Sequence, residues 1–241
     1  MDACAGLAAD VLCLQEVDRH QPRSGHTDQT AEVARALAAT AWRFEPALIG
    51  EPGGQWRPAT GADATDAPTG ATGDRPPAYG VGIVAKLPVR RWRVVRLGGA
   101  GIRAPVAVPG TRRLILVRDE PRVALAAEID GPTGPLVVAT THLSFVPGWN
   151  AVQLRRVARA LASPAHPSVL LGDLNLPGPI PAWVSGWRPL VRAPTFPADD
   201  PRWQLDHVLG HGELPEVVAV ATPELALSDH RGLVVDLAWS R

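Results

Sequence analysis

Three apolar runs of the sequence end in side chains that can do chemistry. The run VLCLQ ends at Glu16, and the run LVVATT ends at His142. The run SVLLG ends at Asp173, and Asn175 follows two residues later. Short apolar runs bounded by polar residues indicate buried β-strands. We therefore expect these four side chains to lie at strand ends.

Three more polar side chains lie at the start of apolar runs. The segment QLDHVLG contains Asp206, and the segment SDHRGLVVDL contains Asp229 and His230. If these two strands run antiparallel to the first three, strand direction alone gathers all the groups at one edge of the core. The predicted rim holds four carboxylates, two imidazoles and one carboxamide: Glu16, Asp173, Asp206, Asp229, His142, His230 and Asn175.

Such a rim suits hydrolysis at phosphorus. Four carboxylates at one edge repel one another unless a cation compensates, and hard oxygen ligands favour Mg²⁺ or Mn²⁺ over zinc. A divalent cation polarises a phosphoryl oxygen, a carboxylate or an imidazole orients water, and His and Asn donors stabilise developing charge. Each residue alone also has an ordinary structural role, as a turn residue, a helix cap or a satisfied buried histidine.

The elements that must position these groups are short strands and two amphipathic helices. Helical periodicity covers residues 28–39, with Thr27 or Asp28 as N-cap, and residues 150–162. Residues 121–130 alternate as a half-buried strand does, and a hairpin is expected to follow at GPTGP. Residues 168–172 and 232–237 are predicted to be buried strands. The pattern indicates a mixed α/β fold with antiparallel pairs.

Composition narrows the class of protein. At 241 residues with no net charge, the chain can form one large α/β domain. Residues 86–122 carry ten Lys or Arg against two acidic residues, which indicates either a solvated face or a surface facing a polyanion. The Gly- and Pro-rich residues 50–78 predict a flexible surface insertion, and residues 98–110 predict a loop. The two cysteines indicate neither a disulfide framework nor a zinc site.

The motifs LCLQEV, THLSF, GDLNLP, QLDHVL and SDHRGLVVDL together resemble the successive motifs of the endonuclease/exonuclease/phosphatase family. The resemblance runs from about Val11 to Leu237, and the insertion at 50–78 is its least covered part. It implies a single domain over residues 1–241 with a four-layer α/β sandwich, in which two mixed β-sheets pack face to face between outer helices.

The resemblance also implies roles for the rim residues. Glu16 would be a metal ligand, and Asp229 would lie near the metal. His142 would hydrogen-bond the scissile phosphate. Asp173 would align or activate the attacking water, while Asn175 would hold a phosphoryl oxygen.

The last two rim residues form a pair in this resemblance. His230 would act at the phosphate as an acid, a base or an electrophile, oriented and kept protonated by Asp206. Such a pair is physically reasonable, because a carboxylate raises the proton affinity of a neighbouring imidazole. The sequence leaves open whether Asp173 or His230 is the general base.

The start of the chain departs from the family pattern. Family members begin with a strand that carries an Asn and is followed by a helix, whereas MDACAGLAAD resembles the end of that helix. We expect the first strand to be missing, which would leave a gap in one sheet and unpaired backbone. A truncated sequence or a weakened variant would explain this. As written, the chain is expected to be cytoplasmic, and secretion stays open because the true N-terminus would be absent.

The leading hypothesis is a monomeric, Mg²⁺-dependent phosphodiesterase or phosphatase without an obligate protein partner. Nucleic acid, a phospholipid head group and an inositol phosphate are all open as substrates, and no long apolar hairpin for membrane docking is expected. The alternative is a catalytically weakened or non-catalytic family member that acts as a binding protein. A Ser-His-Asp hydrolase is disfavoured, because the sequence lacks a G-x-S-x-G motif.

Overall fold

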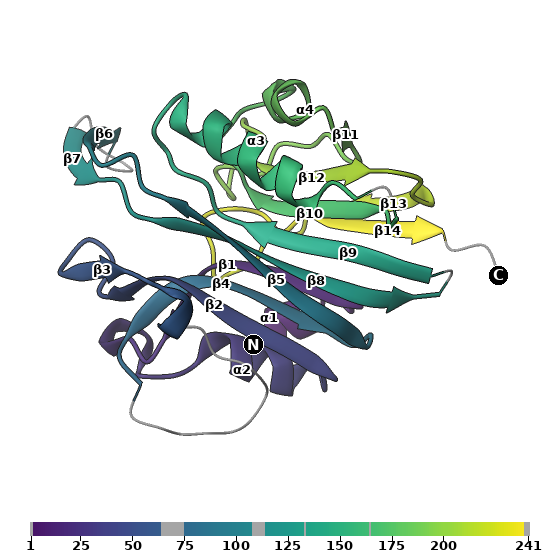
Figure 1. The fold of residues 1–241 in the computed structure, drawn as a ribbon, viewed down its shortest axis with the longest axis horizontal. Coiled ribbons are helices and arrows are strands. Elements are labelled where there is room, and N and C mark those ends of the chain that lie inside the picture. The colour runs from purple at the N-terminus through teal and green to yellow at the C-terminus, as the bar shows by residue number, and fades with distance from the viewer. Residues whose placement is uncertain (1, 64–74, 108–113, 133, 164, 239–241) are drawn as a thin grey trace.

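Four layers of secondary structure make up the computed structural model (Figure 1), which describes residues 2–63, 75–107, 114–132, 134–163 and 165–238. Helices α1 (Asp2–Ala5) and α2 (Gln29–Ala36) cover a four-stranded sheet. That sheet faces a six-stranded sheet, whose other face is covered by α3 (Trp149–Leu161) and α4 (Ile180–Ser185). The predicted four-layer α/β sandwich is confirmed.

The four-stranded sheet is antiparallel throughout, in the order β1-β4-β2-β3. Its strands are β1 (Val11–Arg19), β4 (Ala78–Ala85), β2 (Ala41–Gly50) and β3 (Trp56–Pro58). Strand β3 and the short 3₁₀ helix Gly61–Asp63 fall within the predicted insertion at 50–78, so this part of the segment is regular structure rather than loop. Residues 64–74 of that segment lie outside the described residues.

The six-stranded sheet has the order β11-β12-β10-β9-β8-β5, and its β9 and β10 are parallel. Its strands are β11 (Arg188–Pro189), β12 (Asp206–His211), β10 (Ser168–Asp173), β9 (Gly134–Thr141), β8 (Arg122–Gly131) and β5 (Val89–Gly98). The hairpin expected at GPTGP joins β8 to β9. Strand β12 runs antiparallel to β10, so its start meets the end of β10.

The four remaining described strands form two separate two-stranded ribbons. One pairs β6 (Arg103–Ala107) with β7 (Leu114–Arg118), so part of the predicted loop at 98–110 is a strand. The other pairs β13 (Glu216–Ala221) with β14 (Val234–Ala238). Residues 232–237 were expected to form a buried strand, but β14 is partly exposed because β13 is its only partner among the described strands.

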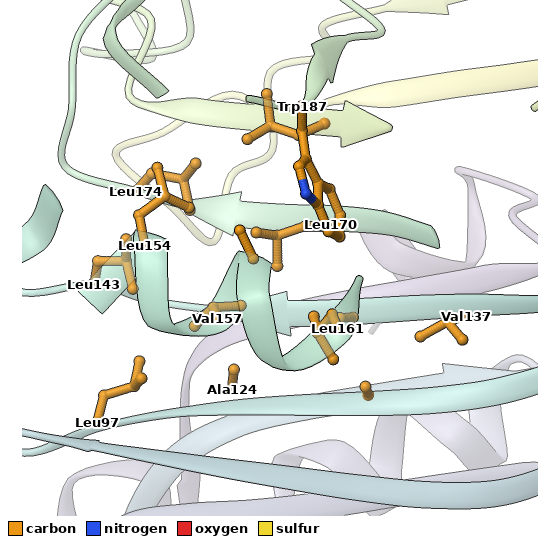
Figure 2. Close-up of a cluster of buried hydrophobic side chains, with 14 of the residues drawn as sticks. Leu97, Ala124, Val137, Leu143, Leu154, Val157, Leu161, Leu170, Leu174 and Trp187 are labelled. Carbon is orange, nitrogen blue, oxygen red and sulfur yellow. The ribbon is translucent and has the colours of Figure 1, made fainter. Parts of the chain in front are cut away.

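The outer core lies between the six-stranded sheet and α3, as Figure 2 shows. Helix α3 buries Leu154, Val157 and Leu161 there, on the face that its periodicity predicts. Strand β8 was expected to be half-buried, but both of its faces are covered. Its Val123 faces the second core between the two sheets, while the small Ala124 lies under α3 and allows the helix to pack closely.

Helix α2 begins at the N-cap that the sequence offers. The Asp28 side chain accepts a hydrogen bond from the backbone N–H of Ala31 at 3.0 Å, which satisfies one of the unpaired donors of the first turn. Of the two expected cap residues, Thr27 and Asp28, the structure therefore uses the second. No helix among the described residues has the length and apolar character needed to cross a membrane.

Strand β1 has one unpaired edge. It pairs with β4 on one side, and no described strand pairs with the other. An apolar cleft of about 560 Å³ lies between β1 and β14, lined by Val11 and Cys13 on one side and by Val235 and Leu237 on the other. The expectation that a first strand is missing beside β1 stays a prediction.

Candidate active site

A β-bulge sets the direction of Glu16. Between Leu14 and Val17 the register of β1 against β4 shifts, so that two residues of β1 oppose one residue of β4. Glu16 takes the left-handed conformation there, with φ of 55°. Pairing resumes at Val17 and continues to Arg19, so Glu16 lies within β1 and not at the strand end that the sequence predicts. Bulges can re-aim a side chain next to a functional site. The Glu16 carboxylate consequently lies 3.4 Å from His142 Nδ1, although 63% of its side chain is exposed.

The neighbouring Gln15 connects the two sheets below this point. Its Nε2 donates to Thr140 Oγ1 on β9 at 2.7 Å. Because Thr140 lies two residues before His142, this bond fixes the bulged part of β1 against the strand that carries the histidine. Gln15 thus connects the two sheets, while the adjacent Glu16 faces the site.

The parallel strands β9 and β10 bring His142 and Asp173 together. Leu143 N donates to Asp173 O at 2.9 Å, and His142 Nε2 lies 3.5 Å from Asp173 Oδ2. Gly172 permits this approach: its φ is 147°, and a Cβ at this position would lie 1.9 Å from the carbonyl oxygen of Thr141. Glycine is therefore required at the point where the two strand ends converge.

Asn175 closes a tight turn after β10. Its backbone N–H donates to Asp173 Oδ1 at 2.9 Å, and its φ of 49° is a conformation that Asn tolerates better than most residues. Its Nδ2 donates to Leu143 O at 3.0 Å and lies 3.2 Å from His142 Nε2. From α3, Asn150 donates to the Asn175 carbonyl at 2.8 Å and anchors the turn.

Asp206 and His230 form the other half of the site. Asp206 begins β12 and lies directly opposite Asp173 on β10. His230 Nδ1 donates to Asp206 Oδ2 at 2.7 Å, and the buried Thr195 donates its hydroxyl to the same oxygen at 2.5 Å. Two donors thus hold one carboxylate oxygen and fix the orientation of the imidazole.

These contacts shift the protonation of both halves. Burial, with a further contribution from the negative charge of Asp206, raises the pKa of Asp173 to about 7. Burial alone would lower the pKa of His230, but the hydrogen bond and charge of Asp206 outweigh it and raise that pKa to about 9. At neutral pH the imidazolium of His230 is therefore charged, while Asp173 is close to its midpoint.

Arg122 is a member of the site that sequence reasoning did not find. It is the first residue of β8, it is buried, and its Nη1 lies 3.2 Å from His142 Nδ1. A guanidinium can only donate, so this contact favours a neutral His142 with an accepting Nδ1. Burial and the charge of Arg122 accordingly hold the pKa of His142 well below its ordinary value.

Asp229 occupies a different position from the other acidic residues. Its side chain is exposed, its backbone carbonyl accepts from Ala198 N at 2.7 Å, and its charge contributes to the raised pKa of His230. Asp229 thus lies beside the other predicted residues. Those six form one series of contacts: Glu16, His142, Asp173, Asn175, Asp206 and His230.

Comparison with known proteins identifies the family of the chain. Residues 1–230 match the family model described as Endonuclease/Exonuclease/phosphatase family. The chain belongs to the endonuclease/exonuclease/phosphatase family. Members of this family are hydrolases that act on phosphoester bonds, and they generally use divalent metals. No curated protein matches the chain.

Solved structures of the endonuclease/exonuclease/phosphatase fold are similar over nearly the whole chain. A family protein from Beutenbergia cavernae is 24% identical with a TM-score of 0.63, and the match covers 98% of this chain and 64% of that one. Mannosyl-6-phosphatase Bt3783 of Bacteroides thetaiotaomicron is 12% identical (TM-score 0.56; 99% and 91% covered). The human Nocturnin catalytic domain is 18% identical with a TM-score of 0.55, and the match covers 99% of this chain and 87% of that one. The chain thus spans less than two thirds of the Beutenbergia protein.

The donor set of this family member fits a divalent cation by its chemistry. Glu16 and Asp229 supply carboxylate oxygens, and the pKa of Asp173, raised by burial and by the charge of Asp206, is typical of an acidic group that lacks a compensating cation. Within the described residues, however, no three His, Cys, Asp or Glu side chains are arranged to hold a metal ion. Both Glu16 and Asp229 are exposed, and Glu16 lies against His142.

Proposed function

We propose that the chain is a metal-dependent hydrolase that cleaves a phosphodiester or phosphomonoester by attack of water on phosphorus. The observation that carries the proposal is the pairing of Asp173, poised near neutrality, with the charged His230 across Asp206. In hydrolysis at phosphorus, a proton acceptor can activate water and a cationic donor can stabilise charge on the phosphoryl oxygens.

Asp173 is the favoured base of the two candidates. Its pKa of about 7 lets it accept a proton from water near neutral pH, since catalytic acids and bases work best near the operating pH. The pKa of about 9 keeps His230 protonated, so that it donates to a phosphoryl or leaving-group oxygen. The structure therefore supports water activation at the Asp173 carboxylate and charge stabilisation at His230.

The remaining site residues hold the phosphate and the cation. Asn175 and His142 would contact phosphoryl oxygens beside Asp173, and the contacts of His142 with Arg122 and Asn175 support these roles. Glu16 and Asp229 would hold Mg²⁺, with Mn²⁺ as the alternative. When bound, the cation supplies positive charge against the phosphoryl oxygens. The substrate is a nucleic acid, a phospholipid head group or an inositol phosphate, and the enzyme acts as a monomer without an obligate protein partner.

A catalytically weakened or non-catalytic binding protein is the second candidate. Two observations favour it: the apolar cleft beside the unpaired edge of β1, and the missing convergence of three metal-binding side chains among the described residues. The cleft would offer a binding partner an apolar surface. The second feature would lower the occupancy of the site by a cation, because the ligands have to be moved into place when the metal binds.

Hydrolysis of bis-p-nitrophenyl phosphate with Mg²⁺ or Mn²⁺ tests the proposal. Asp173→Asn and His230→Gln are each expected to lower the rate by on the order of a hundredfold or more, because each removes a proton-transfer or charge-stabilising group. The matched controls are Asp130→Asn and His166→Gln, which lie near the opposite end of the six-stranded sheet. Turnover that persists in EDTA, or that survives Asp173→Asn, would refute the mechanism.

A further inference from the structure

The β6–β7 ribbon exposes apolar side chains to water. Leu114, Ile115 and Leu116 follow one another on β7 and are 68%, 49% and 64% exposed, and Ile102 just before β6 is 51% exposed. Successive residues of a strand point to opposite faces, so three consecutive exposed residues mean that both faces of the ribbon are uncovered. Two-stranded ribbons alone are marginally stable in water, and uncovered aliphatic patches mark interaction sites.

Two arginines lie at the base of the same ribbon. Arg103 on β6 and Arg118 on β7 are directly opposite each other, and both are exposed. Like charges at directly opposed positions destabilise a pair of strands. Arg118 is held in place by stacking over Trp56, with its guanidinium carbon 4.6 Å from the ring centre. An anionic partner would turn this repulsion into attraction.

The ribbon is fixed to the rim of the candidate active site. Asp119, the residue after β7, accepts from Ser144 Oγ at 2.6 Å and from Ala100 N at 2.5 Å. Ser144 lies two residues after His142, and Arg122, at the start of β8, contacts that histidine. Figure 1 shows the ribbon projecting past the ends of β5 and β8, away from the body of the protein.

We infer that the β6–β7 ribbon docks on the surface of a bilayer that contains anionic phospholipid. The aliphatic side chains Leu114, Ile115 and Leu116 enter the boundary between head groups and acyl chains. Arg103 and Arg118, nearer the body of the protein, meet the phosphates of the head groups. Interfacial segments likewise combine aliphatic side chains with nearby basic residues.

Other occupants explain less of the ribbon. Nucleic acid would satisfy the arginines but not the aliphatic side chains, because bases stack on aromatic rings and guanidinium groups. A second copy of the chain would cover the aliphatic residues, but it would bring another pair of arginines to the same place. A bilayer accounts for both features. If the hydrolase proposal holds, docking also presents a lipid phosphoester to the site.

Co-sedimentation of the full chain with vesicles tests the inference. The probes are vesicles of phosphatidylcholine alone and of phosphatidylcholine with about one third phosphatidylserine. The wild type is expected to sediment with the anionic vesicles, less so at high salt. The double variant Leu114→Ser/Leu116→Ser is expected to bind at least about tenfold more weakly, because two aliphatic side chains no longer enter the bilayer. Arg103→Gln, a second and milder change, is expected to weaken binding to the anionic vesicles selectively.

The matched control is Val218→Ser/Val220→Ser, which removes exposed aliphatic side chains from the other ribbon. It is expected to bind as the wild type does. A wild type that stays in solution with both vesicles overturns the inference, as does unchanged binding of the Leu114→Ser/Leu116→Ser variant. A wild-type dimer that this variant dissociates would show self-association instead. Hydrolysis of bis-p-nitrophenyl phosphate, measured in parallel, separates the two proposals, since vesicle binding needs no turnover.

Discussion

Asp173 and Asp206 lie directly opposite each other at the meeting ends of β10 and β12. The two like charges are not equivalent, because Asp206 receives hydrogen bonds from His230 and Thr195 while Asp173 is buried beside His142. The two carboxylates therefore differ in role: Asp206 is paired with the imidazolium of His230, and Asp173 has a raised pKa. Groups whose environments separate their pKa values in this way are candidates for acid and base roles.

Replacing Asp206 is expected to change the protonation of His230. In Asp206→Asn the hydrogen bond to a carboxylate and its charge are both lost, so the pKa of His230 should fall from about 9 toward or below its ordinary 6.5. Titration of the imidazole ring protons by NMR in metal-free protein measures this. Thr195→Val is the control, since it keeps the charge of Asp206. A His230 midpoint that stays near 9 in Asp206→Asn would contradict the assigned pair.

The metal-free protein is expected to lose stability as the pH rises. Asp173 has a pKa of about 7 in the folded protein against an ordinary 3.8, so the folded state binds its proton more tightly than the unfolded state does. The stability that this proton contributes is lost as the pH rises from about 3.8 to about 7. His230, at about 9 against 6.5, adds stability below pH 6.5 that is lost by pH 9. Urea unfolding in EDTA across this range measures the decline.

The variant Asp173→Asn separates the two contributions. It is expected to remove the decline between pH 4 and 7, and to stabilise the protein at pH 8 by on the order of 1–3 kcal/mol, because a buried charge is no longer formed. The later decline from His230 should remain. A pH dependence in Asp173→Asn identical to that of the wild type would assign the effect to other groups.

Arg122 is expected to act through His142. In Arg122→Gln the guanidinium charge is lost, so the pKa of His142 should rise and its imidazole should lose a fixed donor. We expect turnover of bis-p-nitrophenyl phosphate to fall on the order of tenfold or more, with the NMR titration of His142 shifted upward. Arg90→Gln, which removes an exposed ion pair with Asp130, is the control. A lower rate without a shift in the titration would indicate a structural role alone.

The sequence predicted the parts of the site that depend on strand direction. Glu16, His142 and Asp173 each end an apolar run, and this pattern can be recognised in a single sequence. The bulge at Glu16 leaves no such pattern, because it depends on how β1 pairs with β4. Arg122 and Thr195 were missed for the same reason: they reach the site through register and tertiary packing rather than through spacing along the chain.

Other expectations failed where packing differs from local pattern. The alternation of β8 predicted one exposed face, but α3 covers it because that face carries small alanines such as Ala124 and Ala126. Nothing in the sequence pattern indicated the exposed aliphatic side chains on the β6–β7 ribbon. An aliphatic run such as LILV usually indicates a buried strand, and only the structure shows that Leu114, Ile115 and Leu116 lack a covering layer.

Gly172→Ala is expected to disturb the site and the fold together. The added Cβ would lie 1.9 Å from the Thr141 carbonyl oxygen, at a φ of 147°. Strand ends β9 and β10 must then separate, which moves Asp173 away from His142. We expect a loss on the order of 2–4 kcal/mol in the free energy of unfolding, since backbone cannot yield as a flexible side chain does. Gly101→Ala, with φ of 74° and no neighbour within 4 Å, is the matched control for backbone strain alone.

The unpaired edge of β1 is expected to accept a further strand. An N-terminal extension of about eight residues with alternating aliphatic side chains could pair with this edge and fill the 560 Å³ cleft between Val11 and Val235. Burial of that apolar lining should raise the melting temperature and lower the binding of the dye ANS, because less apolar surface is left exposed. An extension of equal length made of Gly and Ser is the control. Equal melting temperatures for the two extended chains would show that the edge does not accept a strand.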